Sequence, residues 1–89
     1  MAAVHLLIKG RVQGVYYRAS AQAQAAKLGI TGWVKNTAAG HVEAVACGNK
    51  QQLDAFIAWC RQGPPGAHVT ELETQNVEDV AMQGFQIHR

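Results

Sequence analysis

The chain has 89 residues, which is enough for one small domain, because a single hydrophobic core is built from about 50 to 200 residues. Apolar residues make up 48% and charged residues 16% of the composition, which is typical of a globular protein and excludes an intrinsically disordered one. The longest apolar stretches fall far short of the roughly 18 residues that span a bilayer, so no transmembrane helix is predicted. We therefore expect residues 1–89 to fold as a single domain.

The net charge of +2 conceals an uneven distribution of charge along the chain. Residues 1–42 contain five basic residues and no acidic one, whereas residues 43–89 contain three basic and six acidic residues. Because carboxylates repel anions, a binding site for an anion is expected in the first half of the chain.

The two cysteines and the N-terminal stretch indicate a cellular compartment. Cys47 and Cys60 are too few for a disulfide framework and lack the CxxC spacing of redox or zinc motifs, so we expect two reduced thiols in the core. Residues 1–8 are mostly apolar, but they have no basic n-region, and Lys9 follows where a signal peptide would place a cleavage site. We therefore expect a cytoplasmic protein.

The first half of the chain is predicted to form a strand, a helix and a hairpin. Residues 4–9 have the alternating pattern of a strand. The alanine-rich residues 20–28 favour a helix that ends at Gly29. Residues 31–35 and 41–47 have the pattern of two strands joined by a short, glycine-containing loop, which predicts a hairpin.

The second half is predicted to form a helix and two strands. Asn49 and Gln52 have the spacing of a capping box, and the Gly-Pro-Pro-Gly turn at residues 63–66 ends the helix that follows. The apolar positions on one face of this helix are Leu53, Phe56, Ile57 and Cys60. Residues 69–75 are predicted to form a fourth strand, and residues 85–87 a short terminal strand.

This order of elements is β-α-β-β-α-β plus a short C-terminal edge strand. It predicts an α+β protein with the ferredoxin-like sandwich architecture, in which an antiparallel sheet carries two helices on one face. Right-handed crossovers make the first two strands parallel, so their C-terminal ends meet at one edge of the sheet. We therefore expect the loop at residues 10–18 and Asn36 to be neighbours in space.

The loop at residues 10–18 reads Gly-Arg-Val-Gln-Gly-Val-Tyr-Tyr-Arg and leads from a strand to the start of a helix. Backbone N–H groups and the helix dipole favour an anion at such a position. The loop lacks the Gly-Lys-Ser/Thr of nucleotide P-loops and the GxGxxG of dinucleotide-binding folds. It is predicted to be a phosphate cradle without the motifs that bind nucleotides.

Two polar residues near this cradle have both an ordinary and a functional interpretation. Arg18 could be a solvated surface arginine, but no acidic residue lies near it in the sequence, which favours an anion as its partner. Asn36 could serve only the turn after its strand, or its amide could orient a water beside a bound phosphate.

Residues 10–18 and the Gly-Trp-Val-Lys-Asn-Thr of residues 32–37, together with Gly40 and residues 42–43, resemble the acylphosphatase family, small hydrolases of carboxyl–phosphate mixed anhydrides. The resemblance covers nearly the whole chain and implies the ferredoxin-like fold. It implies that Arg18 binds the phosphoryl group of the substrate and that Asn36 positions the attacking water. The positions that match the family's phosphate-binding loop are Val12, Gln13, Gly14, Val15, Tyr16 and Tyr17.

Three positions depart from the common family pattern without removing a catalytic group. Tyr17 stands where phenylalanine is usual, and its hydroxyl could join the hydrogen bonds of the loop. Lys35 stands where arginine is frequent, and Ala39 where a polar residue often precedes the hairpin glycine.

The chemistry of acyl phosphate hydrolysis fits this set of residues. The leaving group is a carboxylate whose conjugate acid has a pKa of about 4, so no general acid is required at neutral pH. An arginine, backbone amides and one asparagine can neutralise the phosphoryl oxygens and place a water in line. The proton of that water could pass to the phosphate of the substrate itself, as is proposed for the family.

The leading hypothesis is a metal-independent acylphosphatase that acts on small acyl phosphates. We expect a monomer without a cofactor or a membrane partner, whose loop also accepts phosphate or sulfate-like anions. No metal site is expected because the four histidines are dispersed, and no nucleic-acid partner because the RNP1 aromatic pattern is absent. The alternative is a ferredoxin-like module that binds RNA or a regulatory anion without turnover. A third hypothesis, a domain cut from a larger carbamoyl-transfer protein, is disfavoured by the start at Met1 and the compact finish at Arg89.

Overall fold

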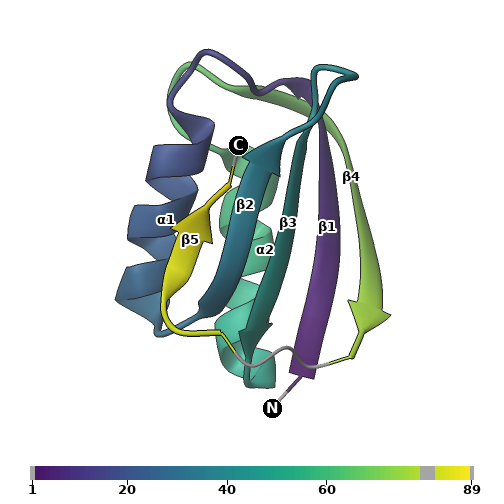
Figure 1. Ribbon diagram of the computed structural model, residues 1–89. Helices are drawn as coiled ribbons and strands as arrows, with labels where there is room; N and C mark the ends of the chain where they lie inside the picture. Colours follow the sequence, from purple (N-terminus) through teal and green to yellow (C-terminus); the bar gives the residue numbers. More distant parts are fainter. Residues whose placement is uncertain (1, 79–81, 89) are drawn as a thin grey trace.

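The computed structural model describes residues 2–78 and 82–88 and confirms the predicted order of elements. Two helices pack against one face of a five-stranded sheet, which is the expected ferredoxin-like α+β sandwich (Figure 1). The elements in chain order are β1 (Ala2–Arg11), α1 (Tyr17–Leu28), β2 (Thr31–Asn36), β3 (Val42–Gly48), α2 (Lys50–Gln62), β4 (His68–Val77) and β5 (Phe85–Ile87). No helix in the described part of the chain is long and apolar enough to cross a membrane.

The strands lie in the order β4-β1-β3-β2-β5. The four longer strands pair antiparallel with their neighbours, as expected, whereas β5 pairs in parallel with β2, so the complete sheet is mixed. β1 and β2 run in the same direction with β3 between them, and their C-terminal ends therefore share one edge of the sheet. In the ladder between β2 and β5, Ile87 lies opposite Val34, two residues before Asn36.

The hydrophobic core lies between the sheet and the two helices. Alternate residues of β1 enter it, because successive side chains of a strand point to opposite faces. Its fully buried members include Leu6, Ile8, Val34, Val42 and Phe56. Burial of this single apolar layer holds both helices on the same face and leaves the other face of the sheet without a covering helix.

Helix α1 begins at Tyr17, three residues earlier than the sequence predicted. Among the described residues no side chain caps its first turn, so burial provides the reason for the earlier start. The Tyr17 side chain is only 2% exposed, and its hydroxyl donates a hydrogen bond of 2.7 Å to the carbonyl oxygen of Cys60, near the end of α2. Arg18 consequently lies within the first turn of α1 rather than before it.

Helix α2 begins with the predicted capping box. Asn49 Oδ1 accepts from the backbone N–H of Gln52 at 2.8 Å, and Gln52 Oε1 accepts from the backbone N–H of Asn49 at 2.7 Å. Gln52 Nε2 also donates to the carbonyl oxygen of Leu28, the last residue of α1, at 2.9 Å. One glutamine therefore starts the second helix and ties it to the end of the first.

Both cysteines are buried as thiols, which confirms their packing role, but they lie on different faces of the sheet. Cys60 is part of the main core, whereas Cys47 packs with Ala3 and Val45 on the face that bears no helix. The sheet separates the two sulfurs, so this fold does not bring them together as a disulfide.

Candidate active site

A cleft of about 390 Å³ opens where the C-terminal ends of β1 and β2 meet the N-terminus of α1. Its described lining consists of Val12, Gly14, Tyr16, Tyr17, Arg18, Ala19, Asn36 and Ile87. The structure thus brings Arg18 and Asn36, which are 18 residues apart in sequence, to the same hollow. Arg18 is the one charged residue among the lining residues that the structure describes.

The loop between β1 and α1 has the backbone geometry of an anion cradle. Gly14 has φ 74°, and Tyr16, the N-cap of α1, has φ 61° and ψ 27°, so both lie in the left-handed region. The first backbone hydrogen bond of the helix runs from the N–H of Ser20 to the carbonyl of Tyr16 at 3.0 Å. The N–H groups of residues 17–19 therefore precede the first intrahelical donor and have no intrahelical acceptor, and together with the positive end of the helix dipole they favour an anion in the cleft.

Arg18 is half-buried at the wall of the cleft. Its Nη1 donates a long hydrogen bond of 3.5 Å to the backbone carbonyl of His88, and within the described residues it makes no ion pair. A guanidinium has five N–H donors, so this one contact leaves most of them for a ligand. A bound anion would also offset the repulsion between Arg18 and the positive end of α1.

Asn36 is the last residue of β2, and it lies opposite Val42 in the ladder with β3. That pairing holds its backbone while its half-buried side chain lines the cleft. An uncharged amide at this position can donate to a bound anion through its nitrogen and accept from a water through its oxygen. This is the arrangement that orienting a water molecule requires.

The six predicted loop residues divide between the cleft and the scaffold behind it. Two of them turn their side chains away from the cleft: Val15 packs against the main core, and Gln13 donates hydrogen bonds to the backbone carbonyls of Thr37 and His41. Val12, Gly14, Tyr16 and Tyr17 line the cleft. The loop is therefore held from behind at two points while its backbone faces the hollow.

The Tyr17 hydroxyl takes no part in the hydrogen bonds of the loop, contrary to the possibility raised by the sequence. It donates instead to the carbonyl of Cys60, which belongs to the last turn of α2, where carbonyl groups lack intrahelical partners. Burial raises the pKa of the Tyr17 phenol above its ordinary value, so the hydroxyl stays protonated. Tyr17 supports the site from behind and takes no role as an acid or base.

Ile87 and Ala19 line the cleft although the sequence did not indicate them. Ile87 reaches it because β5 pairs in parallel with β2. The apolar residues Phe85 and Ile87, on either side of Gln86, are enough to predict a strand, but they do not predict which strand it pairs with. Ala19 lines the cleft because the earlier start of α1 places it in the first turn of that helix.

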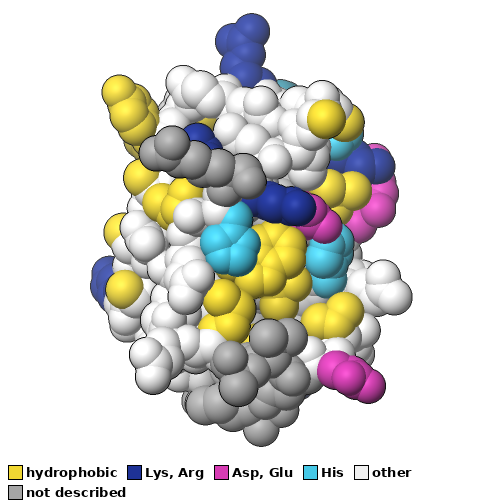
Figure 2. Space-filling model, in the orientation of Figure 1, with side chains coloured by type: hydrophobic (Ala, Val, Ile, Leu, Met, Phe, Trp, Pro, Cys, Tyr) yellow, Lys and Arg dark blue, Asp and Glu magenta, His cyan; other side chains and the backbone are white. Residues whose placement is uncertain are grey.

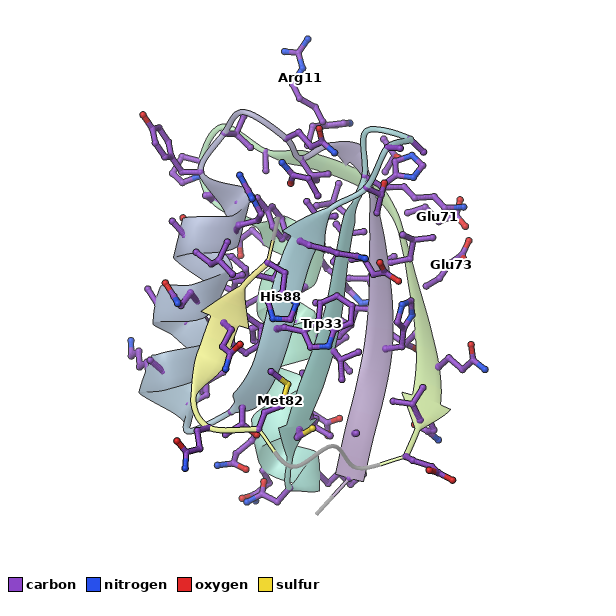
Figure 3. All side chains as sticks on the ribbon, in the orientation of Figure 1. Arg11, Trp33, Glu71, Glu73, Met82 and His88 are labelled. Atoms are coloured by element: carbon purple, nitrogen blue, oxygen red, sulfur yellow. The ribbon has the colours of Figure 1, made fainter. Side chains whose placement is uncertain are left out.

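In its described residues, the uncovered face of the sheet, seen in Figure 2, does not present free aromatic rings on which nucleic-acid bases could stack. The rings of Trp33 and His88 stack at 5.5 Å between centroids with an interplanar angle of 12°, and Figure 3 shows them side by side on this face. Glu43 adds negative charge there, with hydrogen bonds or ion pairs to His5 at 2.7 Å and to Lys35 at 3.6 Å. RNA-binding sheets instead present exposed aromatic rings to the bases.

Across residues 2–78 and 82–88, no three His, Cys, Asp or Glu side chains form a group that could hold a metal ion.

Comparison with known proteins gives consistent matches. A family model described as Acylphosphatase matches residues 4–87. An acylphosphatase of Methylococcus capsulatus is 54% identical over 84 residues, which is 94% of this chain and 88% of that protein. The crystal structure of the acylphosphatase from Bacillus subtilis superposes with a TM-score of 0.96 at 32% identity, with 100% of both chains covered. The structure of an acylphosphatase from Coxiella burnetii gives a TM-score of 0.94 at 34% identity, with 98% of this chain and 92% of that one covered.

Proposed function

This chain belongs to the acylphosphatase family, and we propose that its active site is the cleft between the β1–α1 loop and the end of β2. The enzyme hydrolyses the carboxyl–phosphate bond of small acyl phosphates to a carboxylate and inorganic phosphate. The observation that carries the placement of the site is that one hollow is lined by an arginine without an acidic partner in the described residues, by an asparagine and by the start of a helix.

Arg18 and the backbone amides of the loop bind the phosphoryl group in this proposal. The guanidinium supplies a fixed positive charge, and the N–H groups at the start of α1 supply neutral donors. Together they neutralise the charge on the phosphoryl oxygens as the bond to the carboxylate breaks. Inorganic phosphate and sulfate share the geometry of these oxygens and bind at the same place.

Asn36 orients the attacking water. Its amide faces the cleft from the end of β2, opposite the loop that holds the phosphoryl group, so it can hold a water in line with the bond that breaks. The water oxygen forms a bond to phosphorus, and the carboxylate leaves with the electron pair of the P–O bond. The proton of the water passes to an oxygen of the phosphoryl group.

No general acid or metal ion is required in this reaction. The leaving carboxylate is stable at neutral pH because its conjugate acid has a pKa of about 4. The described lining of the cleft contains no carboxylate, imidazole or thiol that would have to move a proton. We further propose that the enzyme acts as a cytoplasmic monomer without a nucleic-acid or membrane partner, in keeping with its two buried thiols.

Substitution of Arg18 tests this site. We expect Arg18→Ala to lower kcat/KM for benzoyl phosphate at least about 100-fold, because the variant loses a charge that contacts the transferring group. Arg11→Ala is the matched control, since Arg11 is exposed on the same segment and points away from the sheet (Figure 3). Equal losses in the two variants would indicate a general effect of charge and would contradict a direct role for Arg18.

Two further measurements examine the reaction itself. Addition of a metal chelator is expected to leave kcat unchanged, and loss of activity that Mg²⁺ or Zn²⁺ restores would contradict the metal-free reaction. Hydrolysis in water enriched in oxygen-18 is expected to place the label in phosphate, because the water attacks phosphorus. Label in the carboxylate would show attack at carbon and would overturn the role proposed for Asn36.

A further inference from the structure

The cleft has a second, apolar side that the phosphoryl group does not use. Among the described residues, the large hydrophobic side chains with the greatest exposure are Tyr16 at 84%, Val77 at 38% and Ile87 at 38%. Tyr16 and Ile87 both line the cleft, whereas Val77 lies at the end of β4. Scattered exposed hydrophobic residues are normal on a protein surface, but two at the mouth of one polar cleft indicate a surface for an apolar group.

Tyr16 occupies this position in a conformation that is unfavourable for its residue type. It is the one non-glycine residue with positive φ in the described part of the chain, and glycine, asparagine or aspartate would adopt φ 61° at a lower cost. Its ring makes no compensating contribution to the core, because it is 84% exposed. A strained and exposed aromatic residue two positions before Arg18 therefore requires an explanation outside the stability of the fold.

The size of the cleft agrees with a substrate that extends beyond its phosphoryl group. A volume of about 390 Å³ falls within the range of roughly 300 to 1,000 Å³ for sites that bind small organic molecules. Arg18 and Asn36 account for the polar end of an acyl phosphate, and the acyl end then extends toward apolar side chains.

We propose that Tyr16 and Ile87 form the acyl-group side of this cleft and select aromatic and branched acyl phosphates over acetyl phosphate. The aromatic ring of Tyr16 offers a flat face on which an aromatic acyl group can stack, and Ile87 closes the cleft from β5. The acetyl group is too small to cover either side chain. This assignment rests on the proposed placement of the phosphoryl group at Arg18.

The test is the ratio of kcat/KM for benzoyl phosphate to kcat/KM for acetyl phosphate, with released phosphate measured for both substrates. Tyr16→Asn removes the ring while keeping a residue that tolerates the left-handed backbone, and we expect the ratio to fall about ten-fold. Ile87→Ala is expected to lower the ratio by a smaller factor, and Tyr16→Phe to keep it. Val77→Ala is the matched control, because Val77 has the same exposed fraction as Ile87 but lies outside the cleft, and both rate constants should stay unchanged.

Three outcomes would overturn the assignment. An unchanged ratio in both Tyr16→Asn and Ile87→Ala would remove the acyl-group surface while leaving the acylphosphatase site intact. Equal losses on both substrates in Tyr16→Asn and Tyr16→Phe would show that Tyr16 only shapes the loop. If the unsubstituted chain hydrolysed neither substrate, the proposed function would fall together with the inference, so the two failures are distinguishable.

Discussion

The side-chain amide of Gln13 donates a hydrogen bond of 2.9 Å to the backbone carbonyl of Thr37, 24 residues further along the chain. The same nitrogen donates to the carbonyl of His41 at 2.8 Å, and His41 in turn accepts from the N–H of Thr37 at 2.9 Å. Thr37 directly follows Asn36, so Gln13 connects the loop proposed to hold the phosphoryl group to the residue proposed to orient the water.

Loss of this connection should slow catalysis. We expect Gln13→Ala to lower kcat for benzoyl phosphate about ten-fold or more, because small misplacements of reacting groups are costly in rate. The free energy of unfolding should fall by about 1 to 2 kcal/mol, because two carbonyls each lose one of their donors. Gln24→Ala, at a half-buried glutamine of α1, provides the control in the same assays. A normal kcat in a destabilised Gln13→Ala variant would reduce this contact to a purely structural role.

The Tyr17 hydroxyl should contribute to stability and not to catalysis. Tyr17→Phe leaves the ring in place but removes the donor to the carbonyl of Cys60, so the free energy of unfolding should fall by about 1 to 3 kcal/mol. Urea denaturation measures this difference, with Tyr16→Phe as the control at an exposed hydroxyl. If Tyr17→Phe unfolded at the same urea concentration as the parent, the buried hydrogen bond would carry no net stability.

The stability of the fold should depend on pH through Glu43. The hydrogen bond from His5, with a smaller contribution from Lys35, holds the pKa of the Glu43 carboxyl below its ordinary value. A carboxyl group with a lowered folded-state pKa stabilises the fold above its unfolded pKa of about 4.3, and this stabilisation is lost as the pH falls through the folded-state value.

Thermal unfolding between about pH 7 and pH 3 measures this effect. Glu43→Gln should be less stable than the parent at pH 7 by less than about 1 kcal/mol, because the pair is partly exposed, and the difference should disappear at acidic pH. Glu78→Gln controls for the loss of one carboxylate elsewhere on the surface. A difference that persisted unchanged to pH 3 would show that Glu43 contributes through packing and not through its charge.

The two thiols should be unreactive in the folded protein. Burial raises the pKa of Cys60 to about 12, and both cysteine side chains are at most 2% exposed. We expect a thiol-specific reagent at about pH 8 to label neither cysteine until denaturant unfolds the chain, because the thiolate is the reactive form. Rapid labelling of one thiol under native conditions would show local opening of the core or of the opposite sheet face.

The residues of the cleft differ in how far they could be predicted from the sequence. The proximity of residues 10–18 to Asn36 follows from the order of elements and the handedness of crossovers, both of which are properties of the pattern. The contact of Gln13 with the hairpin and that of Tyr17 with Cys60 join residues 24 to 43 positions apart, and they depend on packing geometry that periodicity does not contain.

The start of α1 and the position of Ile87 also depend on tertiary packing, which the local sequence does not predict. The sequence offers no capping side chain before Tyr17, so local signals favoured a later start, and burial of the Tyr17 ring decided otherwise. The strand at Phe85–Ile87 was expected. Its parallel pairing with β2, which brings Ile87 to the cleft, is determined by tertiary packing and not by the local sequence. The polar residues of the cleft could be predicted from the sequence, whereas the contribution of Ile87 to its apolar side could be recognised only from the fold.

Steady-state hydrolysis of benzoyl phosphate by Asn36→Ala, with inhibition by inorganic phosphate measured in the same series, tests the catalytic assignment most directly. Because Asn36 is proposed to act on the water and Arg18 on the phosphoryl group, we expect kcat to fall at least about 100-fold while the inhibition constant for phosphate changes less than about two-fold. A kcat close to that of the unsubstituted enzyme, in a folded Asn36→Ala variant, would contradict the proposed role of Asn36.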